Sequence, residues 1–131
     1  MQQLASAARA ARDRAYAPYS NFAVGAALLD EHGRIHAGCN IENAAYPQGL
    51  CAEAVALGQL VLAGGTRVLA AVVAGESAQP VTPCGGCRQK LREFAAPDTP
   101  VLVADTAVVQ LRLTLEQLLP HSFGPEHLGK T

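Results

Sequence analysis

Residues 51–75 read CAEAVALGQLVLAGGTRVLAAVVAG, and this stretch decides the fold class of the chain. Its first part, Cys51 to Ala63, predicts a helix that the glycine pair at 64 and 65 closes. Its last part, Val68 to Ala74, is a nearly unbroken apolar run, which predicts a strand buried on both faces. A helix followed directly by such a strand is typical of a layered α/β domain.

The alternation of helices and strands continues outward from this stretch in both directions. Towards the N-terminus we expect a helix over residues 3–15 that Pro18 ends, then strands over residues 22–29 and 34–42. Towards the C-terminus we expect a helix over residues 83–94, strands over residues 100–105 and 110–113, and a short helix that begins at Thr114. We therefore predict a single domain over residues 1–131, a three-layer α/β/α fold with a central mixed sheet of about five strands.

Composition argues against several classes of function. The chain of 131 residues carries a formal net charge of -1, and 50% of its residues are hydrophobic while 16% are charged. Nucleic-acid-binding domains are usually strongly basic, so we expect no nucleic-acid partner and a small-molecule substrate. We interpret the basic group Arg88, Lys90 and Arg92 as a solvated helix face. Because few polar side chains are available to cover the surface, we expect another subunit to cover part of it.

The sequence carries no recognisable membrane anchor or export signal. No apolar run reaches the length that spans a bilayer, and residues 1–4 (MQQL) lack the features of a signal peptide. Four cysteines without an export signal indicate a reducing compartment, where thiols serve metal binding or catalysis rather than disulfides. We therefore expect a cytoplasmic protein with no membrane partner.

Two short segments carry the chemistry of the chain: Cys51-Ala52-Glu53 and Pro83-Cys84-Gly85-Gly86-Cys87. Each segment opens a predicted helix, and Cys84 and Cys87, at i and i+3, share a face of the first helical turn. A helix N-terminus lowers the pKa of a thiol and supports thiolate ligands. Three such ligands on zinc leave a fourth tetrahedral position for water. A glutamate two residues after one ligand, with a later P-C-x-x-C, is the signature of zinc deaminases.

Other interpretations of the cysteines remain open at this point. The Cys84–Cys87 pair alone fits a redox dithiol, although this leaves Cys51 and Glu53 unexplained. A structural zinc site closed by four thiolates would need Cys39, but such sites usually come as two short-spaced pairs. We expect Cys39 to be a small buried hydrophobic residue in a strand. A non-catalytic zinc-stabilised domain would have no need of Glu53. The four histidines lie outside both segments, and we assign them no metal.

Further motifs surround the two cysteine segments: APYSNFAVGAAL (residues 17–28), GCNIENAAY (38–46), LLP (118–120) and FGP (123–125). Together with the cysteine segments they resemble the cytidine deaminase family, in its small homotetrameric, three-cysteine branch. The resemblance implies one Zn²⁺ per subunit held by Cys51, Cys84 and Cys87, with Glu53 as the catalytic proton shuttle. It also implies a homotetramer with shared active sites that serves pyrimidine salvage.

The resemblance further implies a set of substrate-binding residues. Asn40 and Glu42 match positions that hydrogen-bond the ribose hydroxyls, and a spacing of two places both on one face of a strand. Phe22 matches an aromatic that packs beside the pyrimidine, and Thr82 matches a position whose backbone carbonyl faces the exocyclic amine. The set also contains Ala52, and three residues that match positions reaching a neighbouring subunit's site: Ala44, Tyr46 and Phe123. The implied enzyme is a hydrolase that converts cytidine and deoxycytidine to uridine and deoxyuridine with release of ammonia.

One position departs from the pattern of this branch. The branch commonly has Arg directly after the glutamate, where it offsets thiolate charge, whereas this chain has Ala54. Helix N-termini, Arg88 and Gln89 are the candidates to replace that charge. The segment CAEAVALG (residues 51–58) also looks like blasticidin-S deaminase. Deamination of a related aminopyrimidine nucleoside, such as blasticidin S, is therefore the alternative function.

Overall fold

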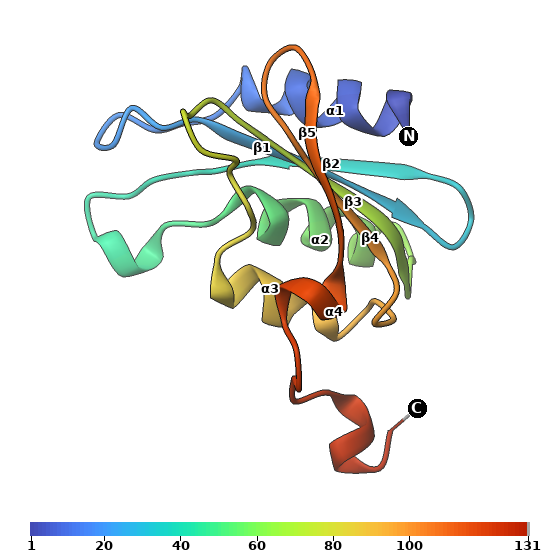
Figure 1. The fold of residues 1–131 in the computed structure, drawn as a ribbon. Coiled ribbons are helices and arrows are strands. Elements are labelled where there is room, and N and C mark those ends of the chain that lie inside the picture. The colour runs from blue at the N-terminus through green and yellow to red at the C-terminus, as the bar shows by residue number, and fades with distance from the viewer. Residues whose placement is uncertain (131) are drawn as a thin grey trace.

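A five-stranded mixed sheet lies between two helical layers in the computed structural model, which describes residues 1–130 (Figure 1). The strand order is β2-β1-β3-β4-β5, with β1 at Val24–Asp30, β2 at Ile35–Cys39, β3 at Val68–Gly75, β4 at Pro100–Ala104 and β5 at Val109–Thr114. The β3–β4 pair is parallel, and the other neighbouring pairs are antiparallel. The predicted three-layer α/β/α fold is therefore confirmed.

The helices divide between the two faces of the sheet. Helix α1 (Gln2–Arg12) covers one face, and α2 (Ala52–Leu62), α3 (Gly85–Arg92) and α4 (Leu115–Leu118) cover the other (Figure 1). Two short 3-10 helices, η1 (Tyr46–Gln48) and η2 (Pro125–Leu128), lie in the connections after β2 and α4.

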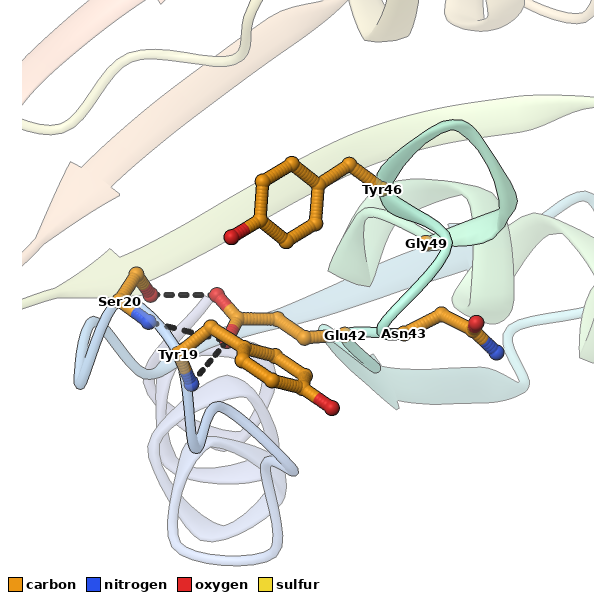
Figure 2. A pocket seen from close by; sticks show the side chains of 6 residues that line it. All are labelled: Tyr19, Ser20, Glu42, Asn43, Tyr46 and Gly49. Atoms are coloured by element: carbon orange, nitrogen blue, oxygen red, sulfur yellow. Dashed lines mark hydrogen bonds between the residues drawn. The ribbon is translucent and has the colours of Figure 1, made fainter.

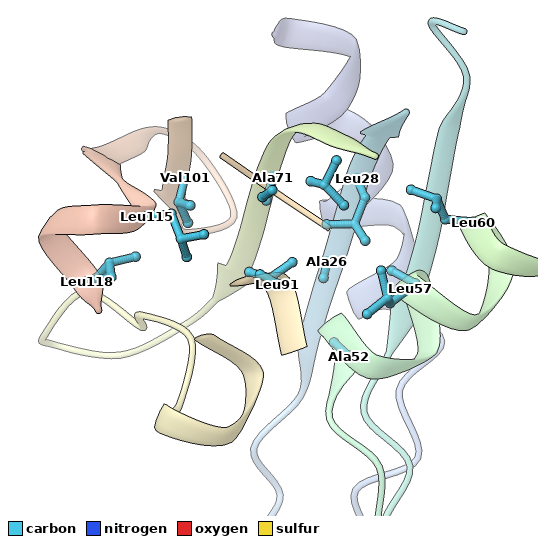
Figure 3. Close-up of a cluster of buried hydrophobic side chains, with 13 residues drawn as sticks. Ala26, Leu28, Ala52, Leu57, Leu60, Ala71, Leu91, Val101, Leu115 and Leu118 are labelled. Atoms are coloured by element: carbon cyan, nitrogen blue, oxygen red, sulfur yellow. The ribbon is translucent and has the colours of Figure 1, made fainter. Parts of the chain in front are cut away.

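Two clusters of buried apolar side chains hold these layers together. The smaller cluster joins α1 to the sheet and contains Leu4, Ala8 and Val72. The larger cluster joins α2, α3 and α4 to the other face, and Figure 3 shows its leucines, Leu28, Leu57, Leu60, Leu91, Leu115 and Leu118. Burying a leucine side chain contributes about 1.5–3 kcal/mol relative to leaving it exposed, so this cluster anchors the helices that carry the cysteines.

Some element boundaries differ from the sequence-based expectations for local reasons. Helix α1 ends at Arg12 rather than at residue 15, because Tyr16 has left the helix and pairs with Ile41 in an isolated β-bridge. Strand β2 ends at Cys39 rather than at residue 42, because Ile41 pairs with Leu50 instead of continuing the sheet. Cys39 is the last residue of its strand, as the expectation of a strand position requires, but its side chain is half-buried rather than buried.

Two glycines allow helices to approach the sheet closely. A Cβ on Gly25 would lie 2.0 Å from the carbonyl oxygen of Ala8 in α1, and one on Gly38 would lie 2.4 Å from the amide nitrogen of Ala56 in α2. These neighbours are backbone atoms, so a whole helix would have to move to make room. Gly38 therefore sets the distance between β2 and the helix whose N-terminus carries Cys51.

We expect Gly38→Ala to lower the free energy of unfolding by about 3 kcal/mol, because the added methyl group overpacks the β2–α2 contact. The matched control is Gly58→Ala in α2, where an added Cβ meets no atom within 4 Å. Alanine is favoured over glycine within a helix by about 1 kcal/mol, so the control should be as stable as the parent or more so. Denaturant unfolding measures both variants, and equal stabilities would contradict the close-packing argument.

Candidate active site

The three cysteines of the two segments meet where α2 and α3 begin. Cys51 is the N-cap residue of α2, Cys84 is that of α3, and Cys87 is fully buried in the first turn of α3. Their sulfur atoms all lie within 4.8 Å of one another, and Cys51 Sγ is 3.9 Å from Cys84 Sγ. Sulfur ligands at about 2.3 Å from a tetrahedral zinc ion would be about 3.8 Å apart. The three thiols therefore fit one zinc ion.

Two of these thiols resist ionisation in the absence of a cation. Burial raises the pKa of Cys51, and burial with the nearby charges of Glu53 and Cys51 raises that of Cys87. A hydrogen bond from the Cys87 backbone lowers the pKa of Cys84. Because three thiolates this close repel one another, they ionise together only where a positive ion offsets their charge.

Cys39 lies outside this group. Among residues 1–130, the cluster that could hold a metal ion consists of Cys51, Cys84 and Cys87. All four cysteines are free, and Cys39 is at the end of β2. This placement argues against a zinc site closed by four thiolates and leaves one tetrahedral position that no cysteine fills.

Glu53 is buried beside the cluster. It lies in the first turn of α2, and 4% of its surface is exposed. Burial raises the pKa of its carboxyl group, while its own backbone N–H, the side chain of Cys87 and the charge of Lys90 oppose the rise. A carboxyl group with a raised pKa holds a proton at higher pH than an exposed one, which suits it to general acid and base chemistry.

A cavity of about 250 Å³ is lined by Glu53 and by two of the thiols, Cys51 and Cys84. It contains four of the eight residues that the resemblance implies for substrate binding: Phe22, Asn40, Ala52 and Thr82. Val24, Val73 and Val81 complete its walls, and the sequence pattern marks them only as ordinary apolar residues of strands and loops. Apolar walls with a few polar groups are typical of small-molecule sites.

The other four residues of that set lie elsewhere in the single chain. Glu42 and Tyr46 line a second cavity, of about 340 Å³ (Figure 2). Ala44 is exposed, and the ring of Phe123 stacks on His127 with 4.9 Å between ring centroids. Phe123 lies in the segment after α4, which extends away from the sheet in Figure 1.

Asn40 and Glu42 therefore line different cavities. Strand alternation was expected to turn both side chains the same way, but it does not apply to these two residues. The reason is that β2 ends at Cys39, so residues 40–42 do not continue its regular pleat.

Arg88 is not part of a solvated helix face, contrary to the expectation for the basic group of α3. It is half-buried, and its guanidinium donates to the carbonyl oxygens of Pro83 (2.7 Å) and Leu118 (2.7 Å) and to Thr82 Oγ1 (3.0 Å). These bonds tie the segment before Cys84 to α3 and α4. Arg88 thereby holds a wall of the cavity in place.

Lys90 brings a positive charge into the groove that Ala54 lines. Both residues line the same shallow apolar groove between α2 and α3, and the positive charge of Lys90 lowers the pKa of Glu53. Gln89, one of the expected replacements for the missing Arg, instead donates to the carbonyl oxygen of Phe123 at 2.9 Å. Lys90 was not anticipated because the α2–α3 packing, not sequence proximity, brings it to this place.

The fold and the site together define a class of protein. Two helix N-termini on one face of a mixed sheet group three thiols beside a buried glutamate, which is the arrangement of a zinc-dependent hydrolase of the deaminase type.

Comparison with known proteins agrees with this class. The family model for the cytidine and deoxycytidylate deaminase zinc-binding region matches residues 1–103, which include the three grouped cysteines. The chain belongs to this family, and its cofactor is zinc. A cytidine deaminase of Sporosarcina psychrophila is 41% identical over 129 residues, which are 98% of this chain and 95% of that protein.

Solved structures support the same assignment. The crystal structure of cytidine deaminase from Burkholderia pseudomallei has a TM-score of 0.86 at 42% identity, and the match covers 93% of this chain and 98% of that one. The structure of cytidine deaminase from Mycobacterium tuberculosis has a TM-score of 0.80 at 41% identity, with 94% and 96% covered. The resemblance drawn from the sequence motifs is therefore confirmed.

Proposed function

We propose that this protein hydrolytically deaminates cytidine and deoxycytidine to uridine and deoxyuridine with release of ammonia. The proposal takes residues 1–131 as one domain with one Zn²⁺ per subunit. The observation that carries it is the position of Glu53, which is buried beside three thiols that fit zinc and faces the cavity of Phe22 and Asn40. The similarity to named cytidine deaminases supports the same substrate.

The zinc ligands and Glu53 have different roles in the proposed reaction. Zinc held by Cys51, Cys84 and Cys87 would supply an activated water for attack on ring carbon C4. Glu53 takes a proton from this water and delivers it to ring nitrogen N3, which makes C4 electrophilic. After the water oxygen bonds to C4, Glu53 takes the second proton of that water and delivers it to the amino group. The C4–N bond then breaks, ammonia leaves and the C4 carbonyl of uridine forms. In each transfer the carboxylate must accept a proton and keep it until delivery, and the pKa of Glu53, raised by burial, favours the protonated state in between.

The walls of the cavity hold the nucleoside. Phe22 is 39% exposed, and its ring offers an aromatic face on which the pyrimidine packs. Asn40 accepts a hydrogen bond from the Val24 N–H (2.9 Å) and donates one to the Phe22 carbonyl (2.8 Å). A primary amide has two donors and two acceptor positions, so one of each remains for a ribose hydroxyl.

We also propose a homotetramer with shared active sites. Tyr46 and Phe123 are 76% and 57% exposed, and both lie outside the cavity of Glu53. Large aromatic side chains are enriched in subunit interfaces, where Ala44, Tyr46 and Phe123 would reach the site of a neighbour. Sedimentation velocity tests the assembly, and a fully active monomer would contradict it.

The cellular setting is a further part of the proposal. The free state of all four cysteines fits a reducing compartment, and we place the protein in cytoplasmic pyrimidine salvage. Among residues 1–130, no helix combines the length and the apolar character needed to cross a membrane.

The direct test is to quantify zinc and follow the loss of cytidine absorbance on the same purified protein. We expect one zinc ion per chain and release of one ammonia per uridine formed. Blasticidin S serves as the comparison substrate, because it distinguishes a nucleoside deaminase from the alternative that the segment CAEAVALG suggests. A zinc-loaded protein that leaves cytidine unchanged would overturn the proposal.

A further inference from the structure

We propose that Ser20 is a positioning residue that orients the carboxylate of Glu42 towards the sugar of the nucleoside. The inference rests on the proposed function, because it assigns to Glu42 a hydroxyl of the bound substrate. Ser20 itself lies in the exposed loop between α1 and β1 and lines the second cavity with Glu42 and Tyr46 (Figure 2).

The carboxylate of Glu42 is bound by two consecutive residues of this loop. Its Oε1 accepts hydrogen bonds from the backbone N–H of Tyr19 (2.9 Å) and of Ser20 (3.1 Å), and its Oε2 accepts one from the Ser20 hydroxyl (Figure 2). The Ser20 hydroxyl is the main cause of a lowered pKa at Glu42, so the carboxylate is ionised at neutral pH. A carboxylate offers about four acceptor positions, so one remains for a ligand hydroxyl.

The same hydroxyl connects Glu42 to the cavity of Glu53. Ser20 Oγ accepts a hydrogen bond from the Phe22 N–H at 3.0 Å, and the Phe22 carbonyl accepts one from Asn40 Nδ2 at 2.8 Å. The backbone of Phe22 is thus held at one end by Ser20 and at the other by Asn40. Because Ser20 has one proton and donates it to Glu42, the bond from Phe22 must enter at its oxygen lone pair.

Substitution of Ser20 can remove one hydroxyl from this series of hydrogen bonds and leave the backbone bonds in place. The backbone bonds from Tyr19 and Ser20 to Glu42 persist whatever side chain residue 20 carries. The hydroxyl alone binds Oε2, so its loss frees the rotation of the carboxylate about its last bond. Ordering that group again when the sugar binds would cost free energy, which weakens binding without changing the chemistry at Glu53.

We expect Ser20→Ala to raise KM for cytidine about tenfold, the effect of one hydrogen bond to a charged group, while kcat changes by less than about twofold. Ser20→Thr retains the hydroxyl and should restore KM to within about threefold of the parent. In a Glu42→Ala background, Ser20→Ala should raise KM by less than about twofold, because the group through which it acts is absent.

Two results would overturn the proposal. One is an unchanged KM in Ser20→Ala, and the other is a full tenfold increase in KM when Ser20→Ala is added to Glu42→Ala. The second result would assign Ser20 a role in loop structure alone. Calorimetric dissociation constants for uridine, measured on the zinc-loaded variants, test the same contacts without turnover. If Ser20→Ala binds uridine more weakly than the parent, but the parent does not deaminate cytidine, the proposed function fails and the positioning role stands.

Discussion

Replacing Glu53 with glutamine will lower the turnover of cytidine by about a thousandfold or more while the protein retains one zinc ion per chain. The glutamine side chain has nearly the same shape and fills the same buried place in the first turn of α2. It cannot take up or release a proton, and positioned general acid–base catalysis typically contributes about 10²- to 10⁴-fold. Glu53 carries both proton transfers of the proposed mechanism, so we expect the loss at the upper part of this range.

The measurement combines the loss of cytidine absorbance with zinc quantification on the same preparation. Glu116→Gln is the matched control, since Glu116 also lies in the first turn of a helix but is exposed and outside the cavity. Its turnover should stay within about twofold of the parent, as is usual for a surface substitution. A Glu53→Gln variant with near-normal turnover would exclude the proton-shuttle role.

Replacing Cys87 with alanine will remove stoichiometric zinc and with it the activity. Cys87 is fully buried and contributes one of three sulfur atoms that lie within 4.8 Å of one another. Two remaining thiols cannot complete the site, and a catalytic metal lowers the barrier by several kcal/mol. We therefore expect turnover to fall by about a thousandfold or more. Chelation of the unmodified protein should abolish activity in the same way, and added zinc should restore it.

Cys39→Ala is the matched control for this experiment. It also removes one thiol, but Cys39 lies at the end of β2 and outside the cluster, so zinc content and activity should stay at the parental level. Zinc quantification and the absorbance assay on both variants provide the comparison. Loss of zinc from Cys39→Ala would instead support a structural site closed by four sulfurs.

Much of the fold could be predicted from local patterns. The apolar run at residues 68–74, the glycine pair before it and the helix that opens at Cys51 correspond closely to β3 and α2. Likewise, α4 begins within one residue of the expected position: Thr114 is its N-cap residue and forms a capping box with Gln117. These features depend on residues a few positions apart, and such short-range preferences can be recognised in a sequence.

The same distinction applies to the candidate site: features set by neighbouring residues were predictable, and features set by tertiary contacts were not. The spacing of Cys84 and Cys87 sufficed to place both at the start of one helix, and Cys51-Ala52-Glu53 sufficed to place a carboxylate beside a thiol. The different cavities of Asn40 and Glu42 were not predictable, because the end of β2 is set by the pairing of Ile41 with Leu50. The roles of Arg88 and Lys90 likewise depend on how α3 packs against its neighbours.

The sequence alone predicted an α/β protein with two cysteine segments suited to zinc and a nearby acid, since each segment and each strand is recognisable from neighbouring residues. That Cys51 meets Cys84 and Cys87 depends on the packing of α2 against α3. Only the tertiary structure decided that Ser20 binds Glu42, 22 residues away, and that Arg88 binds the Leu118 carbonyl, 30 residues away. The physical reason is that hydrogen bonds between distant segments form only where the packing of the sheet and helices brings a donor and an acceptor together. Residue types along the chain do not encode that packing in any local pattern.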